Sequence, residues 1–317
     1  MPEFFNVLPP AQALKVLLDR LEPRPVSPAV DVPIAEALGR VTAQAAHATE
    51  DLPSFPRSAM DGYSLRAADT FGASEGAPAY FTIVGEVPMG KPAGVSVGTG
   101  DAALAYTGGM LAGGADAVIM VENTQKVDTN TIEVVRPVAH GENVVQPGED
   151  VKRGEVILPA GHYLRPQDLG GLTAMGITAV SVAAKPRVAI LSLGDEVVAP
   201  KATPAEGQIR DINTYTISAL VEQAGGVPLP LGIIKDNYEE QTGSAIRGLD
   251  MADVLVISAG SSVSSRDMTA QVIDNLGQPG MLVHGLAIRP GKPTVIGLVN
   301  SKPAFGLPGN QIGRAHV

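Results

Sequence analysis

Two adjacent carboxylates, Asp195 and Glu196, closely follow the apolar run Arg187 to Leu193. Carboxylate oxygens are the ligands that hard divalent cations prefer, and a carboxylate can also hold a proton for a reacting group. The same pair could instead stabilise the positive N-terminal end of a helix dipole. The two residues alone leave both interpretations open.

A second segment runs from Ser258 to Asp267 and combines hydroxyl groups, a glycine and a final carboxylate. Small side chains and free backbone N–H groups ahead of a helix form the setting that binds phosphates. The segment matches neither the Walker A motif nor the dinucleotide-binding motif, so a polar loop without a ligand is the alternative. Taken alone, Asp267 is interpreted as the N-cap of the following helix.

A third segment, Arg289-Pro290-Gly291-Lys292-Pro293, places two cations three residues apart on a turn stiffened by proline. Paired cations on stiff backbone suit an oxyanion such as phosphate or a metal oxoanion. A solvated turn is the alternative. The five histidines include no pair four residues apart, which argues against a zinc site, and Ser58 lacks the Gly-x-Ser-x-Gly context of a hydrolase nucleophile.

These segments need strands and helices to position them, and the apolar pattern beyond Lys185 predicts an alternation of the two. The predicted strands are Arg187–Leu193, Leu229–Ile234 and Asp253–Ser258, and the predicted helices are Asn213–Ala224, Tyr238–Arg247 and Met268–Leu276. This alternation is typical of a parallel sheet covered by helices on both faces. Ligands of such sheets bind outside the carboxyl ends of the strands, which is where the loops Gly194–Glu196, Ile234–Asp236 and Ser258–Ser262 would lie.

The first half of the chain has a different pattern. Leucines at helical spacing predict an amphipathic helix over Ala11 to Leu21, and a further helix is predicted around Gln167 to Met175. Between about residues 64 and 140, apolar segments separated by glycine and proline predict a compact β domain. Its predicted strands include Phe81–Val84, Ala117–Val121 and Thr131–Val135.

Composition narrows the function classes. Of the 317 residues, 44% are hydrophobic and 18% are charged, which excludes a fully disordered chain. The net charge of −10 disfavours binding to nucleic acids and to anionic membranes. No apolar run is long enough to span a membrane, and the absence of cysteine excludes disulfides and thiolate metal sites. We therefore expect a cytoplasmic protein.

Each motif is weak alone, but their order along residues 11 to 310 resembles the molybdopterin molybdenumtransferase family, which includes the C-terminal part of gephyrin. The motifs are Pro53 to Tyr63, Tyr106 to Val118, Pro147 to Asp150, Ser192 to Glu196, Ile209 to Asn213, Pro290 to Pro293 and Gly306 to Asn310. Where the family has Gly-Gly-x-Ser-x-Gly-x-x-Asp, this chain reads Ala259 to Asp267 and replaces two of the glycines. This departure indicates a divergent branch.

The resemblance implies a multidomain α/β plus β fold. An elongated α+β first domain would comprise residues 1–50 and 141–184, an inserted β domain residues 51–140, and a three-layer α/β molybdopterin-binding domain residues 185–310. The family continues into a C-terminal β domain, so we interpret the chain as truncated and residues 311–317 as a non-native tail.

The resemblance also implies a reaction, in which molybdate is inserted into the dithiolene of adenylylated molybdopterin and AMP is released. Molybdopterin-AMP and molybdate are the implied substrates, and Mg²⁺ is the implied divalent cation. The implied catalytic set is Asp61, Thr107, Glu196, Asp236 and Asp267, with Asp236 and Asp267 as metal ligands. The implied cofactor-binding residues are Gly194, Asp195, Ser258, Gly260, Ser261, Ser262, Arg289, Pro290, Gly291, Lys292 and Pro293, with Arg289 and Lys292 facing the molybdate or the pterin phosphate.

The family forms homodimers in which two subunits share each active site, so we expect a homodimer. A molybdopterin adenylyltransferase is the expected upstream partner, and neither a nucleic acid nor a membrane is expected. One alternative function is a catalytically weak carrier or scaffold of the same family, which holds molybdopterin or the finished cofactor. A second alternative is the adenylyltransferase itself, which shares the α/β domain but leaves residues 1 to 184 unexplained.

Overall fold

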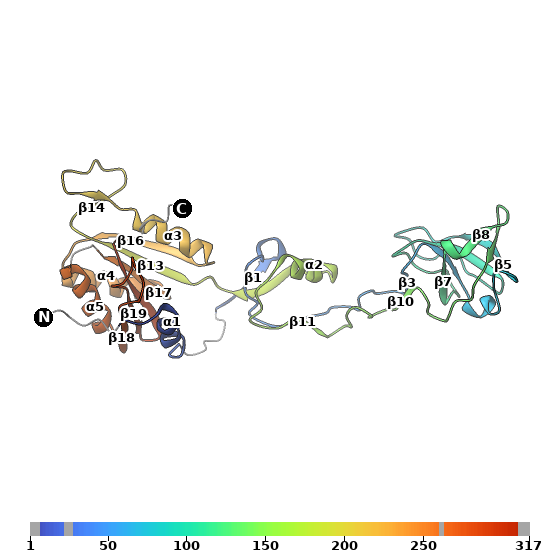
Figure 1. The fold of residues 1–317 in the computed structure, drawn as a ribbon, viewed down its shortest axis with the longest axis horizontal. Coiled ribbons are helices and arrows are strands. Elements are labelled where there is room, and N and C mark those ends of the chain that lie inside the picture. Colours follow the sequence, from blue (N-terminus) through green and yellow to red (C-terminus); the bar gives the residue numbers. More distant parts are fainter. Residues whose placement is uncertain (1–6, 22–27, 260–262, 310–317) are drawn as a thin grey trace. The chain divides into compact units, whose positions relative to one another are not determined.

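The computed structural model describes residues 7–21, 28–259 and 263–309, and for residue 259 and residues 263–267 it describes the backbone alone. The chain forms two compact units (Figure 1). The first, which we call the α/β unit, comprises Met1–Val30 and Ala183–Val317. The second, the β unit, comprises Asp31–Val182.

A six-stranded sheet forms the centre of the α/β unit. Its strand order is β16 (Val227–Ile234), β13 (Arg187–Leu193), β17 (Val254–Ala259), β20 (Lys302–Pro308), β19 (Val295–Val299) and β18 (Pro279–His284). The first four strands run parallel, whereas β18, β19 and β20 pair antiparallel. The parallel sheet predicted from the segments of β13, β16 and β17 is therefore confirmed, whereas β18 and β19 were not predicted. A tight turn at Asn300 and Ser301, both with positive φ, joins β19 to β20, and so short a connection permits only antiparallel pairing.

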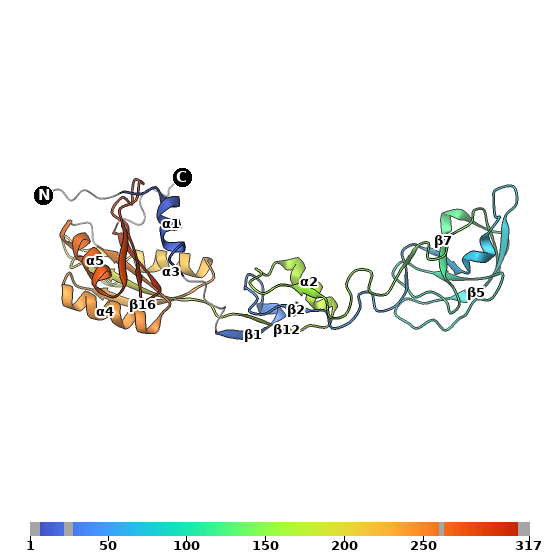
Figure 2. The same ribbon diagram turned by 90° about the horizontal axis from the view of Figure 1, so that it is seen from below.

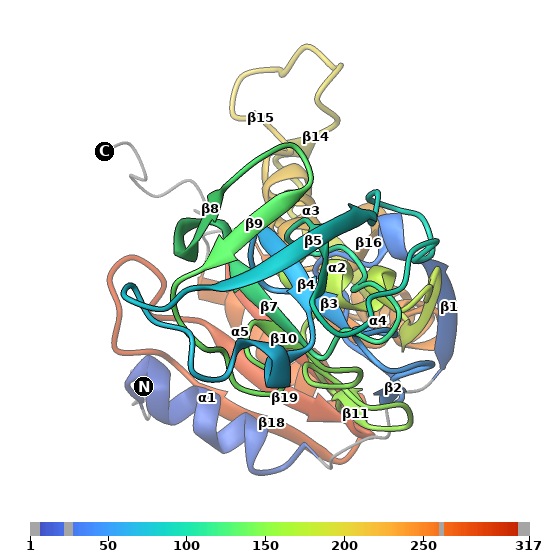
Figure 3. The ribbon, with the colours of Figure 1, turned by 90° about the vertical axis from the view of Figure 1, so that its right-hand side faces the viewer.

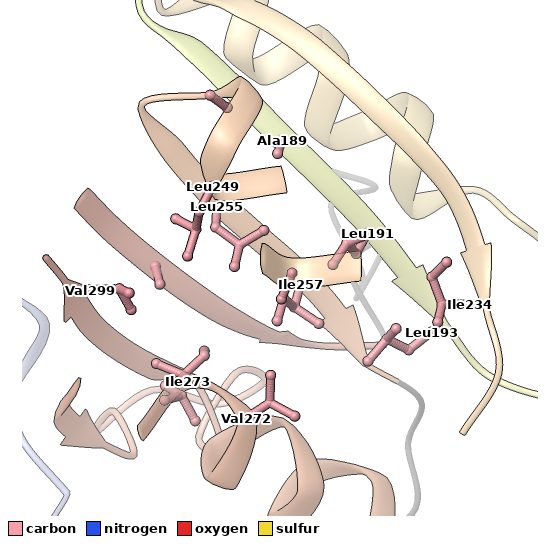
Figure 4. Close-up of a cluster of buried hydrophobic side chains, with 14 of the residues drawn as sticks. Ala189, Leu191, Leu193, Ile234, Leu249, Leu255, Ile257, Val272, Ile273 and Val299 are labelled. Atoms are coloured by element: carbon pink, nitrogen blue, oxygen red, sulfur yellow. The ribbon is translucent and has the colours of Figure 1, made fainter. Parts of the chain in front are cut away.

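Helices cover both faces of this sheet. Alternate residues of β13 point to opposite faces: Ala189, Leu191 and Leu193 pack into one cluster with α4 (Tyr238–Met251) and α5 (Val263–Asn275), shown in Figure 4. Val188 and Ile190 pack on the other face, against α3 (Asn213–Gln223). The three-layer α/β arrangement is thus confirmed, as are the six predicted segments. The predicted and observed boundaries differ most at the end of α4 and at the start of α5.

The N-terminal helix α1 (Pro10–Leu18) also belongs to the α/β unit. Its buried residues Ala13 and Leu17 pack against Ile296 and Leu298 of β19. Figure 2 shows α1 beside strands of this unit. The family resemblance grouped residues 1–50 with residues 141–184, and within the α/β unit these apolar contacts hold α1 on the sheet.

Strand connections locate the ligand-binding edge of the sheet. The chain leaves β13 through α3 to reach β16, and then crosses to the far side of β13 through α4 to reach β17. Strands β13 and β17 therefore lie side by side, while the helices that follow them, α3 and α5, cover opposite faces of the sheet. The carboxyl ends of β13 and β17 flank this topological switch point, where ligands of doubly wound sheets bind.

The β unit contains a second six-stranded sheet. Its strand order is β7 (Ala117–Met120), β4 (Gly62–Leu65), β6 (Asp101–Ala105), β5 (Ala79–Glu86), β9 (Thr131–Val134) and β8 (Thr124–Lys126). Figure 3 shows β5, β9 and β8 side by side. Fully buried Leu65, Phe81, Ile119 and Ile132 form its core. The predicted β strands of this region are confirmed.

Short elements make up the rest of the β unit and its border. They are β1 (Ala29–Pro33), β2 (Ala46–His47), β3 (Arg57–Ser58), β10 (Val144–Val145), β11 (Val156–Leu158), β12 (Ala179–Ala183) and α2 (Pro166–Ala174), with short 3₁₀ turns at Ile34–Glu36, Ala67–Thr70 and Val121–Asn123. Asp168 organises the start of α2, because its carboxylate accepts hydrogen bonds from the guanidinium and backbone N–H of Arg165 and lies 2.8 Å from His162 Nε2. The Arg165 guanidinium is the largest cause that holds the pKa of Asp168 well below its usual range.

Among the described residues, no helix is both long enough and apolar enough to cross a membrane. Residues 311–317, which we interpreted as a non-native tail, lie outside the described residues.

Candidate active site

Asp61 and Thr107 lie together in the β unit. The antiparallel pairing of β4 with β6 places Gly62 opposite Ala105, so the residues just outside these strand ends meet. The backbone N–H and the hydroxyl of Thr107 both donate to Asp61 Oδ1, at 2.8 and 2.9 Å. These two hydrogen bonds, the backbone one first, lower the pKa of Asp61. The exposed carboxylate is therefore held ionised and in one orientation.

Gly62 explains why a glycine follows this aspartate. The residue lies in the middle of three strands, between β6 and β7, and a Cβ at this position would lie 1.9 Å from the carbonyl oxygen of Ile119. No larger residue fits without moving β7. Close strand packing therefore fixes the backbone that presents Asp61.

Tyr106 is a neighbour of this pair that the sequence did not single out. Its hydroxyl donates to Glu86 Oε2 at 2.9 Å. The hydrogen bond to Glu86 is the largest cause that raises the pKa of Tyr106, and the negative charge of Asp61 adds to it. Two carboxylates, Asp61 and Glu86, thus lie near the Tyr106 hydroxyl on the β unit.

In the α/β unit, Gly194, Asp195 and Glu196 directly follow β13, as the apolar run predicts. The chain then enters β14 (Val197–Val198), which pairs with β15 (Ile209–Arg210). No helix begins here, so the interpretation of the acidic pair as a helix-dipole partner is wrong. Gly194 has a φ of +143°, and a Cβ on it would lie 2.6 Å from Glu196 Oε2. The glycine allows the Glu196 carboxylate to fold back over the strand end.

Asp236, at the carboxyl end of the neighbouring strand β16, joins this acidic pair. Its backbone N–H donates to Asp195 Oδ1 at 3.4 Å. Burial raises the pKa of Asp236, and the negative charges of Asp195 and Glu196 raise it further. Asp236 Oδ1 is buried and has no hydrogen-bond partner among the described residues. We call Asp195, Glu196 and Asp236 the acidic cluster.

The acidic cluster suits a Mg²⁺ ion that substrate phosphates also bind, rather than a metal ion held by protein ligands alone. No three metal-ligating side chains converge on one point within the described part of the chain. Mg²⁺ is usually held by one or two carboxylates together with substrate phosphates, so a complete set of protein ligands is not required. Asp236 Oδ1, which has two further negative charges near it and accepts no hydrogen bond from a described residue, supplies the ligand type that a hard cation takes.

Asp267, the second expected metal ligand, lies on α5. The helix begins at Val263, so Asp267 is in its second turn and the interpretation of this residue as an N-cap is wrong. Its side chain is outside the described atoms. Gly260, Ser261 and Ser262, expected to bind the cofactor, also lie outside the described residues.

Ser258 belongs to a buried network of hydrogen-bonded polar groups that the sequence did not predict. It is 1% exposed at the carboxyl end of β17, and its hydroxyl accepts a hydrogen bond from Asn213 Nδ2 at 2.7 Å. Asn213 Nδ2 also donates to the carbonyl of Gly309, just beyond β20, at 2.7 Å. Asn213 Oδ1 is buried without a partner among the described residues, at a cost of about 1–3 kcal/mol. Asn213 was part of a family motif, but at a helix start it has the pattern of an ordinary cap.

The cationic turn Arg289 to Pro293 connects β18 to β19. The backbone N–H and the hydroxyl of Thr294 donate to the Gly291 carbonyl, at 3.1 and 2.7 Å, and fix the turn. Arg289 and Lys292 are exposed, and neither forms an ion pair within the described residues. Both cations are therefore available to an anion, and the solvated-turn alternative stays open.

Comparisons with known proteins agree with this architecture. A model of the MoeA N-terminal region (domain I and II) matches residues 8–176, and one of a probable molybdopterin binding domain matches residues 189–316. A putative molybdopterin biosynthesis protein of Methanocaldococcus jannaschii is 35% identical over 98% of this chain and 77% of the relative. The molybdopterin molybdenumtransferase of a Nostoc species is 34% identical over 86% of this chain and 63% of its own length.

A solved structure extends the likeness to the fold. The molybdopterin biosynthesis moeA protein of Pyrococcus horikoshii matches with a TM-score of 0.81 and 35% identity, over 96% of this chain and 75% of that protein. The chain thus spans between 63% and 77% of the length of these three relatives. The matches cover both units, and the chain therefore belongs to the molybdopterin molybdenumtransferase family and is an enzyme of molybdenum cofactor biosynthesis.

Proposed function

We propose that this chain inserts molybdate into the dithiolene of adenylylated molybdopterin and releases AMP. The observation that carries the proposal is the acidic cluster at the carboxyl ends of β13 and β16, where Asp236 Oδ1 is buried and has no hydrogen-bond partner in the described part of the chain. A phosphoanhydride and an oxoanion both need positive charge beside them before they react. A cluster of uncompensated carboxylates recruits that charge as a divalent cation.

The chain's residues have separate roles in this proposal. Asp236 and Asp267 would hold Mg²⁺, which when bound neutralises phosphate charge. Glu196, which Gly194 allows to fold over the strand end, would hold or move a proton near the anhydride. Arg289 and Lys292 would bind molybdate or the pterin phosphate through charge-assisted hydrogen bonds.

Asp61 and Thr107 complete the proposed catalytic set from the β unit. Because they lie in a different unit from Glu196 and Asp236, we propose that they reach the site across a homodimer, as the family resemblance implies. Sedimentation velocity would show a stable dimer. A monomer that turns over would contradict this arrangement.

An adenylyltransferase must supply the adenylylated molybdopterin, and we propose that this chain works with one in the cytoplasm.

A catalytically weak carrier is the second candidate function, favoured by Ala259 at a position where the family has glycine. A Cβ at that position restricts how closely backbone approaches a phosphate.

One assay separates these functions. Purified protein is mixed with adenylylated molybdopterin, molybdate and Mg²⁺, and AMP release is followed. Molybdate-dependent AMP release supports the transferase. Tight binding of the pterin without AMP release supports the carrier, and absence of both contradicts the proposal.

A further inference from the structure

Asn213 connects two segments at the switch point of the α/β sheet. It is the first residue of α3 and is 9% exposed. Its amide nitrogen donates to Ser258 Oγ at the end of β17 and to the Gly309 carbonyl just after β20, both at 2.7 Å. An amide nitrogen carries two hydrogens, so these two bonds use its full donor capacity. One side chain thus fixes the ends of two parallel strands to the start of one helix.

The chemistry of the partners fixes the orientation of the amide. A backbone carbonyl only accepts hydrogen bonds, so the nitrogen of Asn213 must face Gly309. The amide oxygen is then left buried with no partner among the described residues. An unsatisfied buried oxygen destabilises a fold. Stability alone therefore does not explain an amide at this position.

The same bond determines what Ser258 can do. Its hydroxyl oxygen accepts the hydrogen of Asn213, so its own hydrogen points elsewhere, and no described residue accepts that hydrogen. Ser258 is the last side chain that the structure describes in β17, and it lies at the edge of the sheet where ligands bind.

The start of α3 is itself held in place from β13. Buried Asp211 accepts a hydrogen bond from the Ser192 hydroxyl at 3.2 Å and another from the backbone N–H of Thr214 at 3.1 Å, both at Oδ1. Asn213 therefore projects from a fixed backbone. Its position is coupled to β13 as well as to β17 and β20.

We propose that Asn213 is a positioning residue that orients the Ser258 hydroxyl as a donor to an anionic oxygen of the bound pterin nucleotide. The identity of that ligand rests on the proposed function. Asn213 acts through Ser258, so a change at Asn213 weakens ligand binding more than it weakens the fold.

The test compares dissociation constants for adenylylated molybdopterin, measured by calorimetry on the full chain, with unfolding temperatures. Asn213→Asp keeps the size of the side chain but replaces both donated hydrogens by an acceptor. We expect Kd to rise about 10-fold or more, because a hydrogen bond to a charged group is lost. Asn275→Asp is the matched control, because Asn275 is an exposed amide that donates to the Tyr238 hydroxyl, and its Kd should change less than about twofold.

Ser258→Ala supplies the second arm and should raise Kd by a similar factor. In the Ser258→Ala background, Asn213→Asp should have little further effect, because its target is gone. Additive effects of the two changes on Kd would overturn the proposal. An unchanged Kd in Ser258→Ala would also overturn it, and this arm remains decisive even if Asn213→Asp fails to fold. If the wild-type chain does not bind the pterin nucleotide, the proposed function and this inference both fail. If the wild type binds the pterin nucleotide and Asn213→Asp binds it with the same Kd, this inference fails but the proposed function does not.

Discussion

Two aspartates, one in each unit, show opposite ways of presenting a carboxylate. Asp61 in the β unit is exposed, yet its Oδ1 accepts two hydrogen bonds from Thr107 and its pKa is lowered. Asp236 in the α/β unit is partly buried beside two other carboxylates, its Oδ1 has no partner among the described residues, and its pKa is raised. Hydrogen bonds stabilise the charge of the first, whereas no described group compensates the charge of the second.

This difference indicates different roles. A carboxylate held by its own chain keeps its orientation whether or not a ligand is present. A carboxylate surrounded by like charges gains free energy when a cation arrives, so its cost in the ligand-free protein becomes binding energy. We infer that Asp61 orients or accepts a proton, whereas Asp236 recruits a metal ion.

The largest effect is expected on catalysis. Asp61→Asn and Glu196→Gln keep side-chain size and remove the charge, so each should lower the rate of AMP release at least about 100-fold. Asp128→Asn is the matched control, because Asp128 is also an exposed carboxylate of the β unit that accepts backbone hydrogen bonds. A near wild-type rate in Asp61→Asn or Glu196→Gln would remove that residue from the mechanism.

The next effect concerns the backbone that presents Asp61. Gly62→Ala should lower the free energy of unfolding by about 3 kcal/mol or more, because the new Cβ meets the Ile119 carbonyl oxygen. Gly94→Ala, with no atom within 4 Å of the added Cβ, should change it by less than about 0.5 kcal/mol. Urea unfolding measures both. Similar values for the two variants would show that β7 yields easily and that Asp61 is not rigidly presented.

A divalent cation should stabilise the protein through the acidic cluster. At a Mg²⁺ concentration tenfold above its Kd, the expected gain is about 1.4 kcal/mol. Asp236→Asn should remove most of this gain, whereas Asp61→Asn should leave it intact. Thermal unfolding with and without Mg²⁺ measures the difference. A gain that survives in Asp236→Asn would place the cation elsewhere.

The smallest effect is on stability without the cation. A carboxyl whose pKa is raised by folding stabilises the fold below its unfolded pKa of about 3.9 and loses that contribution as pH rises through its folded pKa. Asp236→Asn should therefore raise the unfolding free energy at pH 7, because it removes a carboxylate disfavoured by burial and by two like charges. The gain should be less than about 1 kcal/mol, because Asp236 is only partly buried and water screens the charges. The gain should vanish below about pH 3.5. A loss of stability at pH 7 would contradict the raised pKa of Asp236.

Helices and strands could be predicted from the sequence more readily than the contacts between them. Strand β13 matches its predicted range because a continuous apolar run is bounded by Pro186 and Gly194. Strands β18 and β19 were missed because glycines interrupt them: Gly280 adopts a φ of +82°, and Gly297 packs against Ile273.

The site follows the same division. The position of Asp195 after a strand is readable from apolar patterning, but its approach to Asp236, 41 residues away, depends on which strands become neighbours. The role of Asn213 was hidden for another reason. Its partners Ser258 and Gly309 lie 45 and 96 residues away, and no local pattern encodes such a contact.

The contrast between the two aspartates is tested most directly by following their side-chain carboxyl carbons by NMR as a function of pH. Asp61 should titrate below, and Asp236 above, the ordinary aspartate pKa of about 3.9. Addition of Mg²⁺ should lower the pKa of Asp236 and leave that of Asp61 unchanged, because a bound cation favours the charged form. Titration of both aspartates in the same range, or a pKa of Asp236 that Mg²⁺ does not move, would contradict the account.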